Sequence, residues 1–211
     1  LVTDAQRDNG RPSEDIFWMG PVGQPAYGSG PENSLTSLAA EQGEHPAETF
    51  LRLSRESGGK ALFTQRVFNK NMKALANLFS CEHCLPGLGA AGAHVSQVMD
   101  AGWATWVMSH WCRETGHYSI PEAVRRLTSA PARIIGVDDR GVLAVGMRAD
   151  INVFNLDRLG EKQPEIVHDF PFEAPRFIQR GAGYQATICN GVTILRDDEH
   201  TGARAGQIGG R

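Results

Sequence analysis

The stretch that decides the fold is Leu85-Pro86-Gly87-Leu88-Gly89-Ala90-Ala91-Gly92-Ala93-His94-Val95. Its first five residues, 85–89, predict a short strand, and the glycines that follow predict a turn. A helix is predicted next, because Trp103, Trp106, Val107 and Trp111 recur at helical spacing, with His110 on the same face. A strand, a turn and a helix in this order are typical of the βα-units of a parallel sheet or barrel.

Upstream of this stretch the chain shows the same order of elements. Residues 60–68 predict a strand, and Met72, Leu75 and Phe79 line one face of the helix expected after it. Two further helices are predicted before them, one that runs from Ser34 to a stop at Gly43 and one that opens at Pro46. Residues 1–33 are rich in Gly, Pro, Asn and Asp, and we expect an extended lead-in there.

Downstream, the pattern changes from helical to β-like. Residues 119–122, Ser-Ile-Pro-Glu, have the form of a capping box at the start of a helix. After Gly136, short alternating runs are separated by turn residues, and Asn190-Gly191 indicates a hairpin. We therefore expect three regions: the lead-in at 1–33, the helical part at 34–135, and a β-rich part with a C-terminal tail at 136–211.

Composition narrows the class of protein. The 211 residues are 41% hydrophobic and 21% charged, with a formal net charge of -3, which is ordinary for a soluble globular chain and does not favour binding to nucleic acid. No apolar run is long enough to span a membrane, and the first residues do not resemble a signal peptide, so we expect a cytoplasmic protein without a membrane partner. The four cysteines are too few and too unevenly spread for a disulfide scaffold.

The quoted stretch resembles the segment L-P-G-L-G-D-A-G-A-H-V of the N-acyl-D-amino-acid deacylase branch of the amidohydrolase superfamily. The resemblance extends from about Ser34 to the end of the chain. Three further segments show the resemblance. They are S-I-P-E-A-V-R-R-L-T-S-A-P-A-R-I-I-G at 119–136, R-G-V-L-A-V-G-M-R-A-D-I-N-V-F at 140–154, and Asn190-Gly191 with E-H-T-G-A-R-A-G at 199–206.

The resemblance implies an α/β fold, a (β/α)₈ TIM-like barrel with a small β-sandwich, and hydrolysis of carbon–nitrogen bonds other than peptide bonds. The implied substrates are N-acyl-D-amino acids or related small molecules, and the implied cofactor is Zn²⁺ at the C-terminal rim of the barrel. Such an ion polarises the amide carbonyl and lowers the pKa of its bound water. A carboxylate beside that water would take its proton and return it to the leaving amine.

This chain departs from that pattern at the residues that carry the chemistry. Ala90 stands where the family has its aspartate, and a methyl group can neither accept a proton nor bind a metal. The family's His-x-His pair is also missing, since no two histidines lie within four residues of each other. We therefore expect no retained catalytic residue and no metal ligand, and Gly89, Gly92 and His94 are kept as candidates for lining the substrate pocket.

Length leads to the same expectation. A (β/α)₈ barrel needs roughly 250 residues, so this chain is predicted to hold only the last βα-units of a barrel and part of the sandwich. Such a portion leaves an open sheet edge and uncovered helix faces, which makes an oligomer of identical chains a further expectation. We expect a C-terminal portion of an amidohydrolase that has no turnover alone and binds little zinc.

Several residues have a simpler alternative interpretation. His94 could line the pocket or fix the backbone of the glycine-rich turn. Residues 81–84, Cys-Glu-His-Cys, suggest a zinc or redox site, but no second pair at finger spacing follows, so chance occurrence in a loop is the favoured interpretation. The tryptophan stripe fits a helix packed on a barrel wall better than a ligand platform.

Two functional hypotheses follow from different classes. The first is a segment of a zinc-dependent deacylase. The second is a non-catalytic pseudoenzyme or assembly module in which the loss of the carboxylate at position 90 is genuine.

Overall fold

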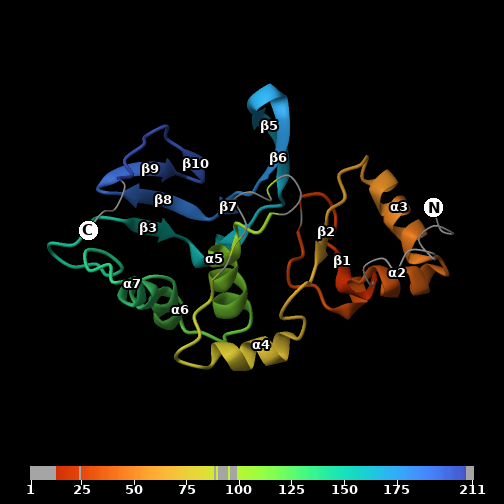
Figure 1. Ribbon diagram of the computed structural model, residues 1–211, viewed down its shortest axis with the longest axis horizontal. Coiled ribbons are helices and arrows are strands. Elements are labelled where there is room, and N and C mark those ends of the chain that lie inside the picture. The colour runs from red at the N-terminus through yellow and green to blue at the C-terminus, as the bar shows by residue number, and fades with distance from the viewer. Residues whose placement is uncertain (1–12, 24, 88, 90–94, 96–98, 208–211) are drawn as a thin grey trace. The chain divides into compact units, whose positions relative to one another are not determined.

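The computed structural model describes residues 13–23, 25–87, 89, 95 and 99–207 (Figure 1). The chain divides into two compact units, Leu1–Asn77 and Leu78–Arg211, which are taken one at a time. Helices and strands are mixed in both. Within the described ranges, no helix is long and apolar enough to cross a membrane.

The first unit is a helical layer with a two-stranded ribbon. Strand β1 (Ile16–Trp18) pairs antiparallel with β2 (Phe63–Gln65), with Phe17 opposite Thr64. The lead-in expected before Ser34 therefore contains a strand. The helical elements are η1 (Ser13–Asp15), η2 (Pro31–Asn33), α2 (Leu35–Gln42), α3 (Pro46–Glu56) and the start of α4 (Met72–Phe79).

Local sequence signals set the ends of these helices. The Ser34 side chain accepts a hydrogen bond from the Ser37 backbone N–H at the start of α2, and Gly43 ends that helix in the left-handed conformation. Helix α3 opens with Pro46, as predicted, and His45 and Glu48 form a reciprocal capping box before it. The two helices bury Leu35, Ala39 and Leu53.

Among its described residues, the second unit has four consecutive helical segments between Trp103 and Ile135 and three antiparallel sheets (Figure 1). Helix α5 (Trp103–Trp106) continues directly into a π-helix, η3 (Val107–Glu114). Helices α6 (Ile120–Leu127) and α7 (Ser129–Ile135) follow. The helix predicted after the glycine-rich turn is thus present, but most of it has the wider π turn.

Four strands form the main sheet, in the order β10-β9-β8-β3. They are β3 (Ile151–Phe154), β8 (Tyr184–Cys189), β9 (Val192–Arg196) and β10 (Glu199–His200). The predicted hairpin is confirmed: Asn190 and Gly191 join β8 to β9 with φ values of 50° and 80°, as a type I′ turn requires.

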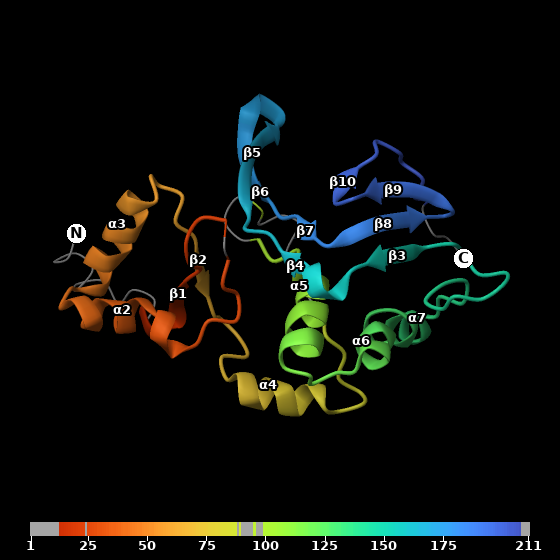
Figure 2. The same ribbon diagram turned by 180° about the vertical axis from the view of Figure 1, so that it is seen from behind.

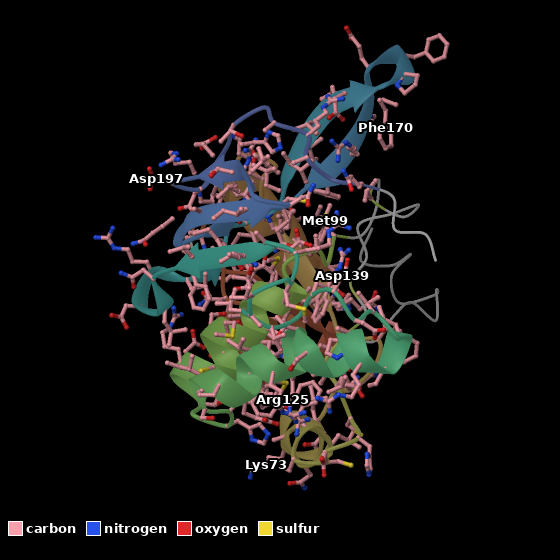
Figure 3. The ribbon with its side chains drawn as sticks, turned by 90° about the vertical axis from the view of Figure 1, so that its left-hand side faces the viewer. Lys73, Met99, Arg125, Asp139, Phe170 and Asp197 are labelled. Atoms are coloured by element: carbon pink, nitrogen blue, oxygen red, sulfur yellow. The ribbon has the colours of Figure 1, made fainter. Side chains whose placement is uncertain are left out.

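Two smaller ribbons complete this unit. Strand β4 (Gly160–Glu161), which follows η4 (Leu156–Arg158), pairs with β7 (Gly181–Ala182). Strands β5 (Glu165–Phe170) and β6 (Ala174–Ile178), joined by η5 (Pro171–Glu173), form a hairpin that extends away from the main sheet (Figure 2). Phe170 lies near the far end of that hairpin (Figure 3).

One expected element is wrong. The described residues of the stretch 85–89 form no strand; residues 85–87 and 89 are irregular backbone. All strand pairs in the described parts of the chain are antiparallel. The last units of a barrel and the sandwich therefore stay a prediction, while the mixture of helix and sheet is confirmed.

Candidate functional site

The glycine-rich stretch is described only at its edges. Ala90, Gly92 and His94, named from the sequence, lie outside the described residues. Gly89 is described, and its backbone packs so closely that a Cβ there would lie 2.2 Å from Trp103 Cδ1 and 2.6 Å from the Asp100 carbonyl oxygen. Glycine is needed at this position because no side chain fits the approach.

The other edge of the stretch is fixed by hydrogen bonds to the segment around β6. The Val95 carbonyl accepts a 2.7 Å hydrogen bond from the Phe177 backbone N–H. The Gly102 N–H, at the start of α5, donates to Gln179 Oε1 at 2.8 Å. Val95 is buried. The backbone is therefore packed closely at Gly89, against Asp100 and Trp103, and is hydrogen-bonded at Val95 to a residue distant in sequence.

A polar cluster lies between the helix start and the β4–β7 ribbon. Glu161, from β4, accepts a 3.3 Å hydrogen bond on Oε2 from Ser109 Oγ of η3. Its Oε1 is buried and has no hydrogen-bond partner among the described residues. Next to it, the hydroxyls of Thr105 and Tyr184 are 2.7 Å apart. Residues from a helix, a π-helix and two strands thus meet at one place.

Burial controls the protonation of this cluster. It raises the pKa of Glu161 to about 7, with a smaller contribution from the charge of Glu114, while the Ser109 hydrogen bond and the Arg113 charge oppose the rise. Burial also raises the pKa of Tyr184. A carboxyl group with a pKa near 7 can both donate and accept a proton at neutral pH.

Sequence reasoning missed Glu161, Ser109 and Tyr184. The three residues are separated by up to 75 positions, and Glu161 stands between Gly160 and Lys162 in a context typical of an exposed turn. Their convergence follows from the pairing of β4 with β7 and from the packing of η3. The sequence contains no local signal for either contact.

The aromatic residues of α5 and η3 form packing contacts. Trp111 is 3% exposed, and its ring meets the rings of Phe79 and Trp106 edge to face. His110 stacks on Trp106 with ring centroids 4.6 Å apart, and its Nδ1 lies 2.9 Å from Glu114 Oε2. The interpretation of this stripe as core is confirmed for Trp111, and His110 is a boundary histidine with a carboxylate partner.

The described residues do not fit a zinc ion. They contain no group of three or more His, Cys, Asp or Glu side chains that could hold a metal. A zinc site needs at least three protein ligands. Glu161 lies beside hydroxyl groups, which suits proton transfer or a structural hydrogen bond.

Two curated relatives match about half of the chain. The D-aminoacylase of Alcaligenes xylosoxydans xylosoxydans is 31% identical over 109 residues, which are 50% of this chain and 20% of that protein. The N-acyl-D-glutamate deacylase of the same organism is 32% identical over 94 residues, or 44% of this chain and 17% of that protein. The chain thus spans about a fifth of the length of the curated relatives that it matches.

Solved structures of similar proteins match more of the chain. A D-aminoacylase crystal structure aligns with a TM-score of 0.51 and 20% identity, covering 90% of this chain and 36% of that one. The N-acyl-D-glutamate deacylase of Bordetella bronchiseptica, solved with zinc and a phosphonate inhibitor, aligns with a TM-score of 0.50 and 22% identity, covering 99% and 39%. These structures share the fold.

The family assignment rests on the sequence match that includes the quoted stretch. Residues 86–195, about half of the chain, match the amidohydrolase family. The matched region contains the glycine-rich stretch, the cluster around Glu161 and most of the main sheet. The chain belongs to the amidohydrolase family.

Proposed function

We propose that this chain is a segment of a D-aminoacylase-like hydrolase, whose complete form cleaves the amide bond of N-acyl-D-amino acids. The observations that carry the proposal are the family match over 86–195 and the two curated relatives, both of which are deacylases of D-amino acid derivatives by name. In the complete enzyme a divalent metal, in our proposal zinc, would activate water for attack on the amide.

We further propose that the chain has no turnover by itself. Ala90 offers no proton acceptor at the family's aspartate position, and general acid–base groups contribute about 10² to 10⁴ in rate. The described residues supply no metal-binding group. The contribution of this chain to a complete site is then structural: it holds the backbone at Gly89, which packs against Trp103, and at Val95, which is hydrogen-bonded to Phe177.

The location and partners are also proposals. All four cysteines are free thiols, which supports a reducing compartment such as the cytoplasm. Large apolar side chains are exposed at Ile134, Ile135, Leu143 and Val145, which supports association with further copies of the chain. A net charge of -3 gives no support to nucleic acid as a partner.

The proposal of inactivity is tested with the purified chain. It is incubated with zinc and with N-acetyl-D-amino acids of several side chains, and the release of free D-amino acid is measured. We expect no release above a control with zinc alone, and a zinc content well below one ion per chain. Turnover above that control, or one tightly bound zinc per chain, would refute the proposal.

The proposed parental activity is tested by a chimera. This chain replaces the homologous segment of the Alcaligenes D-aminoacylase, once with Ala90 and once with Ala90→Asp. We expect the aspartate form to hydrolyse the substrate at least about 10²-fold faster. Equal zinc content of both forms serves as the control for folding. Equal rates with equal zinc content would show that position 90 does not carry the family's carboxylate and would favour a non-catalytic module.

A further inference from the structure

The turn Cys81-Glu82-His83-Cys84, which directly follows α4, brings two thiols together. The Cys81 N–H donates to the Leu78 carbonyl at 3.0 Å, and the Cys84 N–H donates to the Cys81 carbonyl at 3.3 Å. The second bond closes a β-turn, and the first and last Cα atoms of such a turn lie within about 7 Å. Disulfides bridge Cα separations of about 4.4 to 6.8 Å, so the backbone already has a suitable span.

The two thiols contact each other and differ in character. The backbone N–H groups of His83 and Cys84 and the Cys84 thiol all donate to the Cys81 sulfur, and together with the nearby Arg126 charge they lower the pKa of Cys81. The hydrogen bond to Cys81 raises the pKa of Cys84. Cys81 is exposed and Cys84 is half-buried. One thiol is thus accessible and thiolate-prone, and the other is partly shielded from solvent and remains protonated more readily.

A buried arginine holds both ends of this turn. Arg126, on α6, is 5% exposed, and its Nη1 donates to the carbonyls of Cys81 at 3.0 Å and Cys84 at 2.7 Å. Its Nε pairs with Glu122 Oε1 at 2.5 Å. The loop that follows α4 lies alongside α6 in both ribbon views (Figures 1 and 2). The backbone at both ends of the turn is therefore held by one buried side chain.

A metal does not account for this pair. Structural zinc takes four ligands, and the described residues offer no group of three or more ligating side chains, around this turn or elsewhere. A two-cysteine motif with an accessible, thiolate-prone cysteine is instead the arrangement of a redox-active dithiol.

We propose that Cys81 and Cys84 are a reversible dithiol–disulfide pair that exchanges with low-molecular-weight disulfides such as glutathione disulfide. The Cys81 thiolate attacks one sulfur of glutathione disulfide, forms a mixed disulfide and releases one glutathione thiolate. The Cys84 thiol then loses its proton to solvent, attacks the Cys81 sulfur and releases the second glutathione. The two protein thiols are oxidised, and one glutathione disulfide is reduced to two thiols.

The test uses a protease that cleaves after glutamate. Cleavage after Glu82 separates peptide 57–82, whose only cysteine is Cys81, from peptide 83–114, which contains Cys84 and Cys112. The reduced, folded chain is incubated with glutathione disulfide, its free thiols are blocked, and it is digested. We expect the loss of two of the four thiols and a 57–82/83–114 disulfide-linked pair that separates on reduction.

Two variants assign the bond. In Cys112→Ala, the linked pair should persist, because Cys84 is then the remaining cysteine of peptide 83–114. In Cys84→Ala, the second step is blocked, so Cys81 should accumulate a stable mixed disulfide with glutathione that wild-type protein does not retain. Circular dichroism of each variant before oxidation controls for folding.

Three outcomes would overturn the proposal. They are the retention of all four thiols, independent glutathione adducts on Cys81 and Cys84 in the wild-type chain, and a linked pair that disappears in Cys112→Ala. None of them bears on the deacylase assignment, because the pair is tested without substrate and without metal.

Discussion

At the scale of single residues, Arg126 contributes more to the stability of the fold than its neighbour Arg125. Both guanidinium groups pair with Glu122, but Arg126 is buried and also binds two backbone carbonyls, while 38% of the Arg125 side chain is exposed (Figure 3 labels Arg125). A buried charge that loses its partners is costly, whereas an exposed ion pair contributes little.

The two arginines therefore form a matched pair for measurement. Arg126→Lys loses the planar fork that reaches Glu122 and both carbonyls, and we expect it to lower the free energy of unfolding by about 1–3 kcal/mol. Arg125→Lys should change it by less than about 0.5 kcal/mol. Urea denaturation measures both values, and equal losses would contradict the role assigned to Arg126.

Glu161 predicts how stability depends on pH. Its pKa is about 7 in the folded protein and ordinarily 4.5, so between these values the folded state binds more protons than the unfolded state. The contribution of Glu161 to stability should therefore be largest below about pH 4.5. It should fall as the pH rises to about 7 and then level off. The loss amounts to at most roughly 3 kcal/mol.

Substitution tests this assignment. Glu161→Gln removes the titration, so its unfolding free energy, measured from pH 5 to pH 8, should lack this decline. Glu165→Gln is the matched control, because Glu165 is an exposed residue that pairs with Arg180 on the surface. A decline of equal size in wild-type protein and Glu161→Gln would show that another group titrates.

Residue-scale signals were predictable where the interaction is local. Ser119 caps α6 as expected, accepting a 3.4 Å hydrogen bond from the Glu122 N–H. The reciprocal half of the capping box is absent from the described contacts of Glu122, whose carboxylate binds Arg125 and Arg126 instead. These two arginines hold the pKa of Glu122 well below its usual range, at about 2. A charged partner one turn away outcompeted the backbone amide.

At the scale of elements, two glycines with positive φ differ in their surroundings. Gly183, just before β8, has a φ of 89°, and a Cβ there would lie 2.7 Å from the Arg158 carbonyl carbon and the Leu159 nitrogen. Gly191, in the β8–β9 turn, has a φ of 80° but no atom within 4 Å of such a Cβ. Backbone strain acts at both positions, and steric exclusion acts only at Gly183.

Alanine at each position separates these two costs. Gly191→Ala should lower the unfolding free energy by about 1 kcal/mol through its left-handed backbone. Gly183→Ala adds a clash with backbone atoms beside the fully buried Leu159, and about 2–4 kcal/mol is expected. Thermal denaturation of the two variants gives the comparison. If Gly191→Ala were the more destabilising, the close packing at Gly183 would be contradicted.

Elements defined by turn chemistry were predictable, and those defined by distant contacts were not. Gly43, Pro46 and Asn190-Gly191 mark ends and turns where the structure has them, because backbone conformation at these positions depends on a few adjacent residues. The strand expected at 85–89 fails, because an apolar run pairs only if a neighbouring strand is available. The helix after Gly102 changes from α to π geometry at Val107. The spacing of apolar residues does not distinguish the two kinds of helix over so short a segment.

At the scale of the whole molecule, the family was predictable and most of the candidate site was not. The motif at 85–95 indicated the amidohydrolases, which the match over 86–195 confirms. The polar cluster around Glu161 depends on side chains that arrive from distant segments. Cys81 and Cys84, in contrast, are close in sequence, and residues 81–84 alone already suggested a zinc or redox site. Both belong to the second unit. The cluster around Glu161 could not be inferred before β4 and η3 were placed, and the contact of Arg126 with the cysteine turn could not be inferred before α6 was placed.

The π-helix η3 has a consequence for how this region tolerates changes in length. Its hydrogen bonds reach one residue further than those of an α-helix, as in the 2.9 Å bond from the Thr115 N–H to the His110 carbonyl. The segment therefore accommodates a surplus residue. Deleting one residue between Val107 and Glu114 would let this segment form an ordinary α-helix, with the elements before and after it in their present positions. A chain one residue shorter here can therefore keep the same fold.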